Sequence, residues 1–65
     1  MKIKPEYVRK KIRIVDTYGN KFEGKVVELE GPEETESNEP EIGINYAGGI
    51  RMFAENDIDL IEVLD

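Results

Sequence analysis

The sequence predicts an all-β fold: a small five-stranded barrel with a short N-terminal helix and a 3-10 turn before the last strand. Short runs in which apolar and polar residues alternate have the period of half-buried strands. Turns that contain glycine or polar residues separate these runs. The chain of 65 residues is enough for a single domain with a thin core. Because an open sheet would expose unpaired edges, we expect the strands to close into a barrel.

The N-terminal segment 4–10 is expected to form the short helix. Pro5 suits the first helical position, and basic residues follow at the C-terminal end, where the helix dipole is negative. Ile3 and Tyr7 are four residues apart and would place one face of this helix on the sheet.

Five segments are expected to form the strands: residues 11–15, 21–29, 42–46, 50–53 and 58–64. A turn over residues 16–20 joins the first two strands, because aspartate favours the first position of a type I turn and Gly19 can adopt a positive φ. Residues 47–49 form a second tight turn, and residues 54–57 form one turn of 3-10 helix. Gly24 lies in the middle of the second strand and is the expected site of a structural bulge or sharp bend.

The apolar faces of these elements give the expected core. It consists of Val8, Ile12, Ile14, Phe22, Val26, Leu29, Ile42, Ile44, Ile50, Met52, Ile58, Ile61 and Val63. The tyrosines outside this set indicate a protein interface, since aromatic side chains are enriched at such sites. For Phe53 two interpretations stay open, an interface residue or plain core packing.

Residues 31–41 differ in composition from the rest of the chain. They contain no apolar residue, two prolines and five glutamates. We therefore expect a mobile, extended and self-repelling acidic loop inside the single domain 1–65. The glutamates lack the ligand spacing and the glycine turn of a calcium loop, so no metal is expected there. Asp57 and Asp59 are expected to solvate the start of the last strand rather than to hold a metal.

Charge is divided unevenly along the chain, whose formal net charge is −6. Residues 1–25 contain eight basic residues and three acids, whereas residues 26–65 contain Arg51 and twelve acids. The basic residues, with Tyr7 and Tyr18 nearby, form a candidate face for nucleic acid or another acidic partner. They are Lys2, Lys4, Arg9, Lys10, Lys11, Arg13, Lys21 and Lys25. The alternative is an ordinary positive face that complements the acidic remainder of the molecule.

The sequence contains no His and no Cys. These absences remove disulfides, imidazole bases, thiolate nucleophiles and most zinc or iron sites, so we expect no catalytic activity and no cofactor. A core this small also leaves little room for a pocket that could shift the pKa values of two carboxylates apart. No apolar run is long enough to span a membrane and the N-terminus has no apolar signal segment, so a cytoplasmic location is expected.

After the short helix, the segment KIRIVDTYGNKFEGKVVEL resembles the first half of the Sm-like (LSm) domain of small bacterial proteins. Gly24 and Val26 match the x-Gly-x-apolar bend of that family. The tail FAENDIDLIEVL is similar to the last turn and strand of SH3-like and Sm-like barrels. The resemblance implies an SH3-like or Sm-like barrel, with assembly in which the edge strand of one subunit extends the sheet of the next.

Two departures from the family concern RNA binding. The aromatic-Asp-x-x-apolar-Asn signature is absent, and Glu34 occupies the position of its Asn. The segment Gly48-Gly49-Ile50-Arg51 has the residue types of the second signature in a different order. We therefore interpret the chain as a non-catalytic small-barrel binding and assembly module, an adaptor that binds a protein partner or itself. An RNA-binding, homo-oligomeric Sm-like ring is the alternative.

Overall fold

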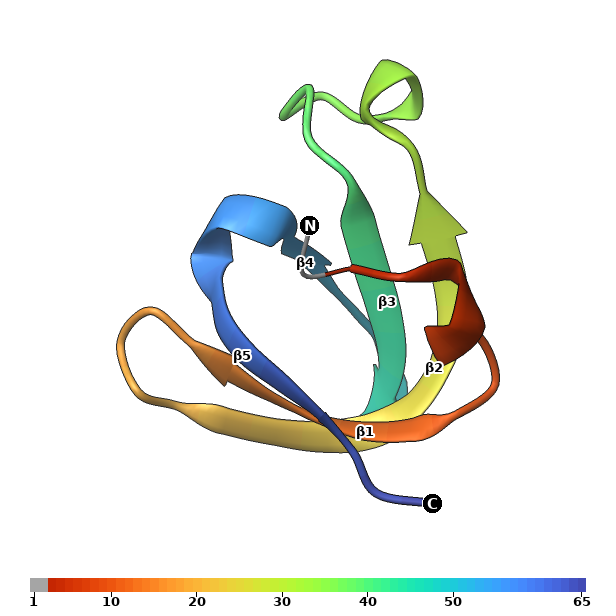
Figure 1. The fold of residues 1–65 in the computed structure, drawn as a ribbon, viewed down its shortest axis with the longest axis vertical. Helices are drawn as coiled ribbons and strands as arrows, with labels where there is room; N and C mark the ends of the chain where they lie inside the picture. The colour runs from red at the N-terminus through yellow and green to blue at the C-terminus, as the bar shows by residue number, and fades with distance from the viewer. Residues whose placement is uncertain (1–2) are drawn as a thin grey trace.

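The structure, a computed structural model, describes residues 3–65, in which five antiparallel strands form one strongly curved sheet (Figure 1). The strands are β1 (Lys11–Asp16), β2 (Lys21–Glu30), β3 (Glu41–Tyr46), β4 (Gly49–Ala54) and β5 (Ile58–Val63). Three 3-10 turns accompany them: η1 (Pro5–Tyr7), η2 (Pro32–Glu34) and η3 (Glu55–Asp57). The all-β prediction is confirmed, and each strand lies within one residue of its predicted ends.

The sheet is open, so the predicted closed barrel is wrong. The strand order is β4-β3-β2-β1-β5, which leaves β4 and β5 at opposite edges. Within residues 3–65, β4 pairs with β3 and β5 pairs with β1, but β4 and β5 do not pair with each other. Their connection is η3 rather than a hairpin turn, and it directs β5 across the molecule to the far side of β1 (Figure 1).

Strand β2 belongs to both halves of the curved sheet. Its first half pairs with β1 and its second half with β3, and it bends between them (Figure 1). The register irregularity lies between Val26 and Glu28, whereas Gly24 stays in register opposite Ile12. A Cβ atom on Gly24 would overlap the backbone carbonyl oxygen of Asn45. The bulge therefore lies beyond Gly24, and the sharp bend expected at Gly24 stays a prediction. The missing side chain of Gly24 permits the end of β3 to approach β2 closely.

The predicted N-terminal helix is also wrong, because only the single 3-10 turn η1 forms. The backbone has left the helical region at Val8, where ψ is 133°, and it has a positive φ of 67° at Arg9. The Arg9 N–H then donates to the Val26 carbonyl at 3.0 Å, and the Val26 N–H donates to the Lys10 carbonyl at 2.9 Å. A first helical turn fixes several dihedral angles for one hydrogen bond, so pairing with β2 is the more favourable arrangement for so short a segment.

The core lies inside the curve of the sheet. It consists of Ile3, Ile12, Ile14, Val26, Ile42, Ile44, Phe53 and Ile58, with Tyr7, Phe22, Leu29 and Ile61 packed against it. Three residues predicted to be in the core are exposed instead, namely Val8, Ile50 and Val63, and Met52 is only half-buried. In β4 the structure buries Phe53 and leaves the opposite face, with Ile50 and Met52, more exposed. Both faces of this strand carry apolar residues, so alternation alone does not predict which face is buried.

Both predicted tight turns form. Asp16 accepts hydrogen bonds from the N–H groups of Tyr18 and Asn20 at 2.9 and 2.8 Å, and Gly19 has a φ of 86°. Ala47 and Gly48 both have positive φ angles, as a two-residue type I′ hairpin requires.

The acidic loop between β2 and β3 is folded rather than extended. Thr35 Oγ1 donates to the Glu39 carbonyl at 2.8 Å and accepts the Glu39 N–H at 3.2 Å. The Glu39 carboxylate accepts the N–H of Asn56 at 2.7 Å, which connects the loop to η3. The loop stands at one end of the molecule (Figure 1), and its mobility stays a prediction. No helix within residues 3–65 is long and apolar enough to cross a membrane.

Candidate functional site

Within residues 3–65, the outer edge of β4 has no backbone hydrogen-bond partner, and it carries an exposed apolar side chain. The two-residue turn makes Tyr46 and Gly49 a hydrogen-bonded pair, and such pairs alternate along antiparallel strands. The N–H and C=O groups of Ile50, Met52 and Ala54 therefore point away from β3. The side chain of Ile50 is 57% exposed.

In the described part of the chain, the outer edge of β5, on the opposite side of the sheet, also has no backbone partner and also carries exposed apolar side chains. The Leu64 N–H donates to the Lys11 carbonyl at 2.8 Å, so the alternation directs the backbone groups of Ile61 and Val63 away from β1. The side chains of Leu60 and Val63 are 48% and 46% exposed. Each edge of the sheet can therefore accept another strand and bury apolar surface in doing so.

The structure brings together four of the predicted basic residues. Lys11 and Lys25 lie opposite each other in the β1–β2 ladder, and Arg9 and Lys10 bond through their backbones to Val26, next to Lys25. All four are exposed. We call Arg9, Lys10, Lys11 and Lys25 the basic cluster.

The other predicted basic residues do not extend this cluster into a continuous face. Arg13 lies between two carboxylates, with its guanidinium 2.8 Å from Glu23 and 3.3 Å from Glu62. The hydrogen bond to Glu23 raises the pKa of Arg13, and the negative charge of Glu23 raises it further. Lys21 lies opposite Val15, at the far end of the same ladder.

The remaining members of the predicted face are also separated from the cluster. Lys4 precedes η1, and Lys2 lies outside the described residues. Tyr7 packs against the core rather than beside the cluster, whereas Tyr18 lies in the β1–β2 turn and is 89% exposed. The predicted basic face is thus divided by the ion pairs of Arg13.

An aromatic group that the sequence analysis did not identify lies at the other end of β1 and β2. The Phe22 ring meets Tyr46 at 5.2 Å and Phe53 at 5.1 Å between ring centroids. The Arg51 guanidinium lies 4.6 Å above the Phe22 ring and 5.4 Å from that of Phe53. These residues are distant in sequence, and only the strand register brings them together.

A cleft of about 330 Å³ lies beside Arg51 and Phe53 and reaches the β1–β2 turn and η3. Asp16 is on its wall. Partial desolvation acts to raise the pKa of Asp16, but hydrogen bonds from Asn20 and Tyr18 together with the charge of Arg51 outweigh it, and the pKa is lowered. The cleft therefore carries charges of both signs, and its arginine is already stacked on aromatic rings.

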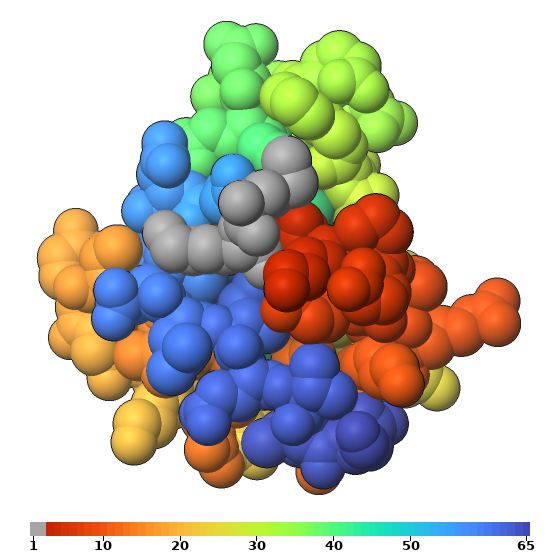
Figure 2. Space-filling model, viewed as in Figure 1, coloured from red at the N-terminus to blue at the C-terminus, as the bar shows by residue number. Residues whose placement is uncertain are grey.

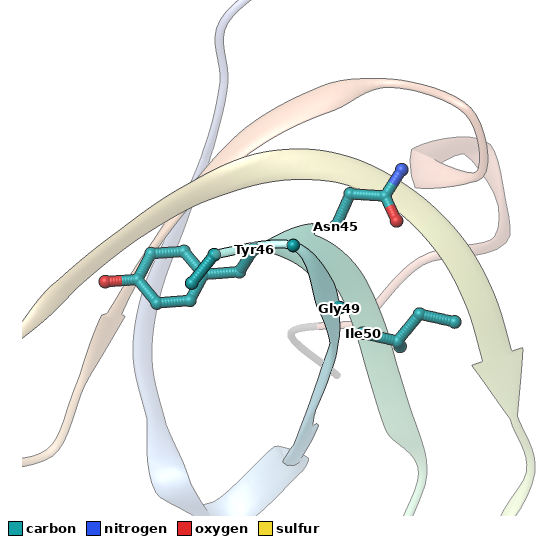
Figure 3. A pocket seen from close by; sticks show the side chains of 6 residues that line it. Asn45, Tyr46, Gly49 and Ile50 are labelled. Atoms are coloured by element: carbon teal, nitrogen blue, oxygen red, sulfur yellow. The ribbon is translucent and has the colours of Figure 1, made fainter.

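Another concavity, about 450 Å³, lies at the tip of the β3–β4 hairpin (Figure 3). The side chain of Tyr46 extends to one side of the hairpin, whereas those of Asn45 and Ile50 extend to the other (Figure 3). These side chains do not converge on a common point. The concavity brings no functional groups together.

A third concavity, about 280 Å³, is an apolar groove between the N-terminal segment and the base of the acidic loop. It is lined by Ile3, Pro5, Leu29, Glu30, Gly31, Pro32 and Pro40. Figure 2 shows the N-terminal segment and the loop as neighbouring patches on one face of the molecule. The groove combines side chains from three separate parts of the chain, and no motif in the sequence signals it.

Carboxylates gather beside this groove. Glu30 lies opposite Glu41 in the β2–β3 ladder. A hydrogen bond to Glu28 raises the pKa of Glu30, with further contributions from desolvation and from the charges of Glu28, Glu34 and Glu41. Within the part of the chain that the structure describes, no three carboxylates are placed to hold a metal ion.

Comparisons with known proteins found no match: no family model, no curated protein and no solved structure is similar to this chain.

Proposed function

We propose that the chain is a non-catalytic binding and assembly module of the Sm-like or SH3-like kind, which extends its sheet by a strand from a second copy and serves as an adaptor for another macromolecule. The observation that supports this proposal is the pair of open sheet edges, β4 and β5. Proteins usually cover or blunt such edges, and a chain that leaves two of them open with exposed apolar residues is suited to strand addition. The absence of His and Cys from the sequence supports a role in binding rather than catalysis.

The two edges are different surfaces, so the expected assembly is head-to-tail, with β4 of one copy against β5 of the next. Sedimentation velocity of the wild-type protein, from micromolar to near-millimolar concentration, tests this. Ile50→Lys and Val63→Lys place a charge on β4 and β5 respectively, at positions that are already exposed. Tyr18→Lys makes the same change away from both edges and serves as the control.

We expect association for the wild type and for Tyr18→Lys, and monomers for each edge variant alone. A mixture of the two edge variants should give dimers and nothing larger, because each variant retains the edge that the other has lost. A wild-type monomer at every concentration, in low and high salt, would overturn self-assembly.

The basic cluster supports a second candidate, an RNA-binding ring. Two lysines directly opposite each other repel, and a phosphate between Lys11 and Lys25 would remove that repulsion. Binding of a single-stranded RNA oligomer should then weaken in Lys25→Gln, with the salt slope reduced by about one. Arg13→Gln should have little effect, because its guanidinium is engaged by carboxylates. Equal binding by Lys25→Gln and the wild type would exclude this candidate.

A further inference from the structure

The apolar groove has the dimensions of a site for amino-acid side chains. Its volume of about 280 Å³ lies below the range of about 300–1,000 Å³ typical of sites for small molecules and cofactors. Ile3, Leu29 and three prolines supply its walls, and prolines offer aliphatic surface without a backbone donor. The site is suited to one or two aliphatic side chains of a partner.

Four glutamates lie on or beside the groove. Glu30 lines it, and Glu41 lies opposite Glu30 in the ladder. Glu34 accepts the Gly31 N–H at 3.0 Å, and a Cβ on Gly31 would lie 2.7 Å from the Glu33 carboxylate, so both carboxylates flank Gly31.

No basic side chain of the described chain neutralises this rim. Among residues 3–65, none of these four glutamates forms an ion pair, and Lys4, next to Ile3, forms none with them. The raised pKa of Glu30 reflects the same crowding of carboxylates. A cation supplied from outside the molecule would relieve this repulsion.

We propose that the groove between the N-terminal segment and the acidic loop binds a basic segment of a partner protein, with an aliphatic side chain among Ile3, Leu29 and the prolines and with Lys or Arg side chains at the glutamate rim. The complementary charges select the partner, and the apolar walls provide the contact. This surface is separate from the sheet edges β4 and β5, so the inference does not depend on strand addition.

The test uses the full-length, isotope-labelled protein and three short peptide probes. The first has a central leucine between two pairs of basic residues (Arg-Lys-Leu-Lys-Arg, with blocked ends). The second replaces the leucine by serine, and the third replaces the basic residues by glutamate and aspartate. Amide chemical shifts are followed during titration to millimolar probe. We expect saturable changes at Leu29 and Gly31 with the first probe alone.

Two variants that each remove one negative charge test whether the glutamate rim contacts the probe. Glu30→Gln should weaken binding of the basic leucine probe about threefold to fivefold, as expected for an exposed ion pair. Asp59→Asn removes one charge from β5, on a different part of the sheet, and should change the affinity less.

Three results of the peptide titrations would overturn the proposal. They are equal binding of the leucine and serine probes, equal weakening by Glu30→Gln and Asp59→Asn, and chemical shift changes confined to β4 and β5. The last result would support strand addition while excluding the groove. Concentration-dependent shifts at Leu29 and Gly31 without any probe would assign the groove to a second copy and would also overturn the proposal.

Discussion

The two halves of the curved sheet use charge in opposite ways. On the outer face where β5, β1 and the first half of β2 pair, Arg13 lies between Glu23 and Glu62, so opposite charges face each other. Where the second half of β2 pairs with β3, Glu30 faces Glu41 and like charges are adjacent. The first half neutralises its charges around Arg13, although Lys11 faces Lys25 nearer its end. In the second half, Glu30 and Glu41 form no ion pair with any other residue among 3–65.

This difference does not follow from the distribution of charge along the chain. Most basic residues precede residue 26 and most acids follow it, which suggests two oppositely charged regions. Strand order changes this picture, because β5 from the acidic part of the chain pairs with β1 from the basic part. The register of the strands then decides which charges meet.

The largest effect is expected at Gly24, which lies where β2 passes from one half to the other. Gly24→Ala places a Cβ against the backbone carbonyl of Asn45, which cannot move as a flexible side chain would, so the two halves must separate. We expect a loss of about 3 kcal/mol or more in the free energy of unfolding, measured by denaturant titration. Gly49→Ala is the matched control, because a Cβ there meets nothing within 4 Å. A loss in Gly24→Ala no larger than in Gly49→Ala would contradict the close approach.

The second prediction concerns pH and Glu30, whose pKa is raised in the folded state by Glu28, by desolvation and by the nearby glutamates. The raised pKa means that ionised Glu30 opposes folding at neutral pH, and that this penalty is lost as pH falls through the raised pKa toward the ordinary value of 4.5. Glu30→Gln should therefore raise the melting temperature at pH 7 and lose this advantage in acid. An equal advantage at both pH values would contradict the assignment.

Asp16 should show a pH dependence of stability opposite in sign to that of Glu30. Its pKa is lowered below the ordinary 3.8, since hydrogen bonds from Asn20 and Tyr18 and the charge of Arg51 outweigh desolvation. Its stabilising contribution is therefore complete above pH 3.8 and is lost as pH falls further. Asp16→Asn should be less stable than the wild type at neutral pH, and the difference should shrink in strong acid.

The third prediction concerns Arg13 and is smaller, because all three side chains of its ion pairs are partly exposed to solvent. Arg13→Gln should lower the melting temperature modestly at low salt and less at high salt. In the Arg13→Gln background, Glu62→Gln should cause little further loss. Fully additive losses in this double-mutant cycle would show that the pair does not interact.

The smallest effect is expected from shortening the acidic loop. Replacing residues 33–38 by a Gly-Ser turn retains Glu39 and Pro40, which accept hydrogen bonds from Asn56 and Glu55. We expect an intact fold with little change in stability, since most of the removed residues are exposed. In the intact protein, amide exchange should be fast across residues 33–38 and slower at Asn56. Strong protection across residues 33–38 would contradict a mobile loop.

Local patterns predicted the strands and turns, because alternation and turn chemistry depend on neighbouring residues. The turn at Asp16 and the 3-10 turn before β5 are examples. Features that depend on distant contacts were not predictable in this way. Arg9 bonds to Val26 instead of continuing a helix, and Phe53 rather than Ile50 is buried because of how β4 packs on the rest of the sheet.

The candidate sites were harder to predict from the sequence than the fold. Four basic residues do form a cluster, but the sequence did not show that Glu62 would engage Arg13 from β5. The apolar groove combines Ile3, Leu29 and Pro40, which are far apart along the chain and match no motif. The aromatic group around Arg51 likewise depends on the register of β4.

The pairing of β1 with β5 also has a consequence for the order of folding. The β1–β2 and β3–β4 hairpins form between neighbours in sequence, whereas Ile12 must find Val63 near the other end of the chain. Contacts of such long sequence separation form late, because loop closure must be completed first. Until β5 docks, β1 has an open side that a β5 strand from another molecule fits equally well. Refolding at high protein concentration is therefore expected to yield strand-exchanged dimers, in which each β5 completes the sheet of its neighbour.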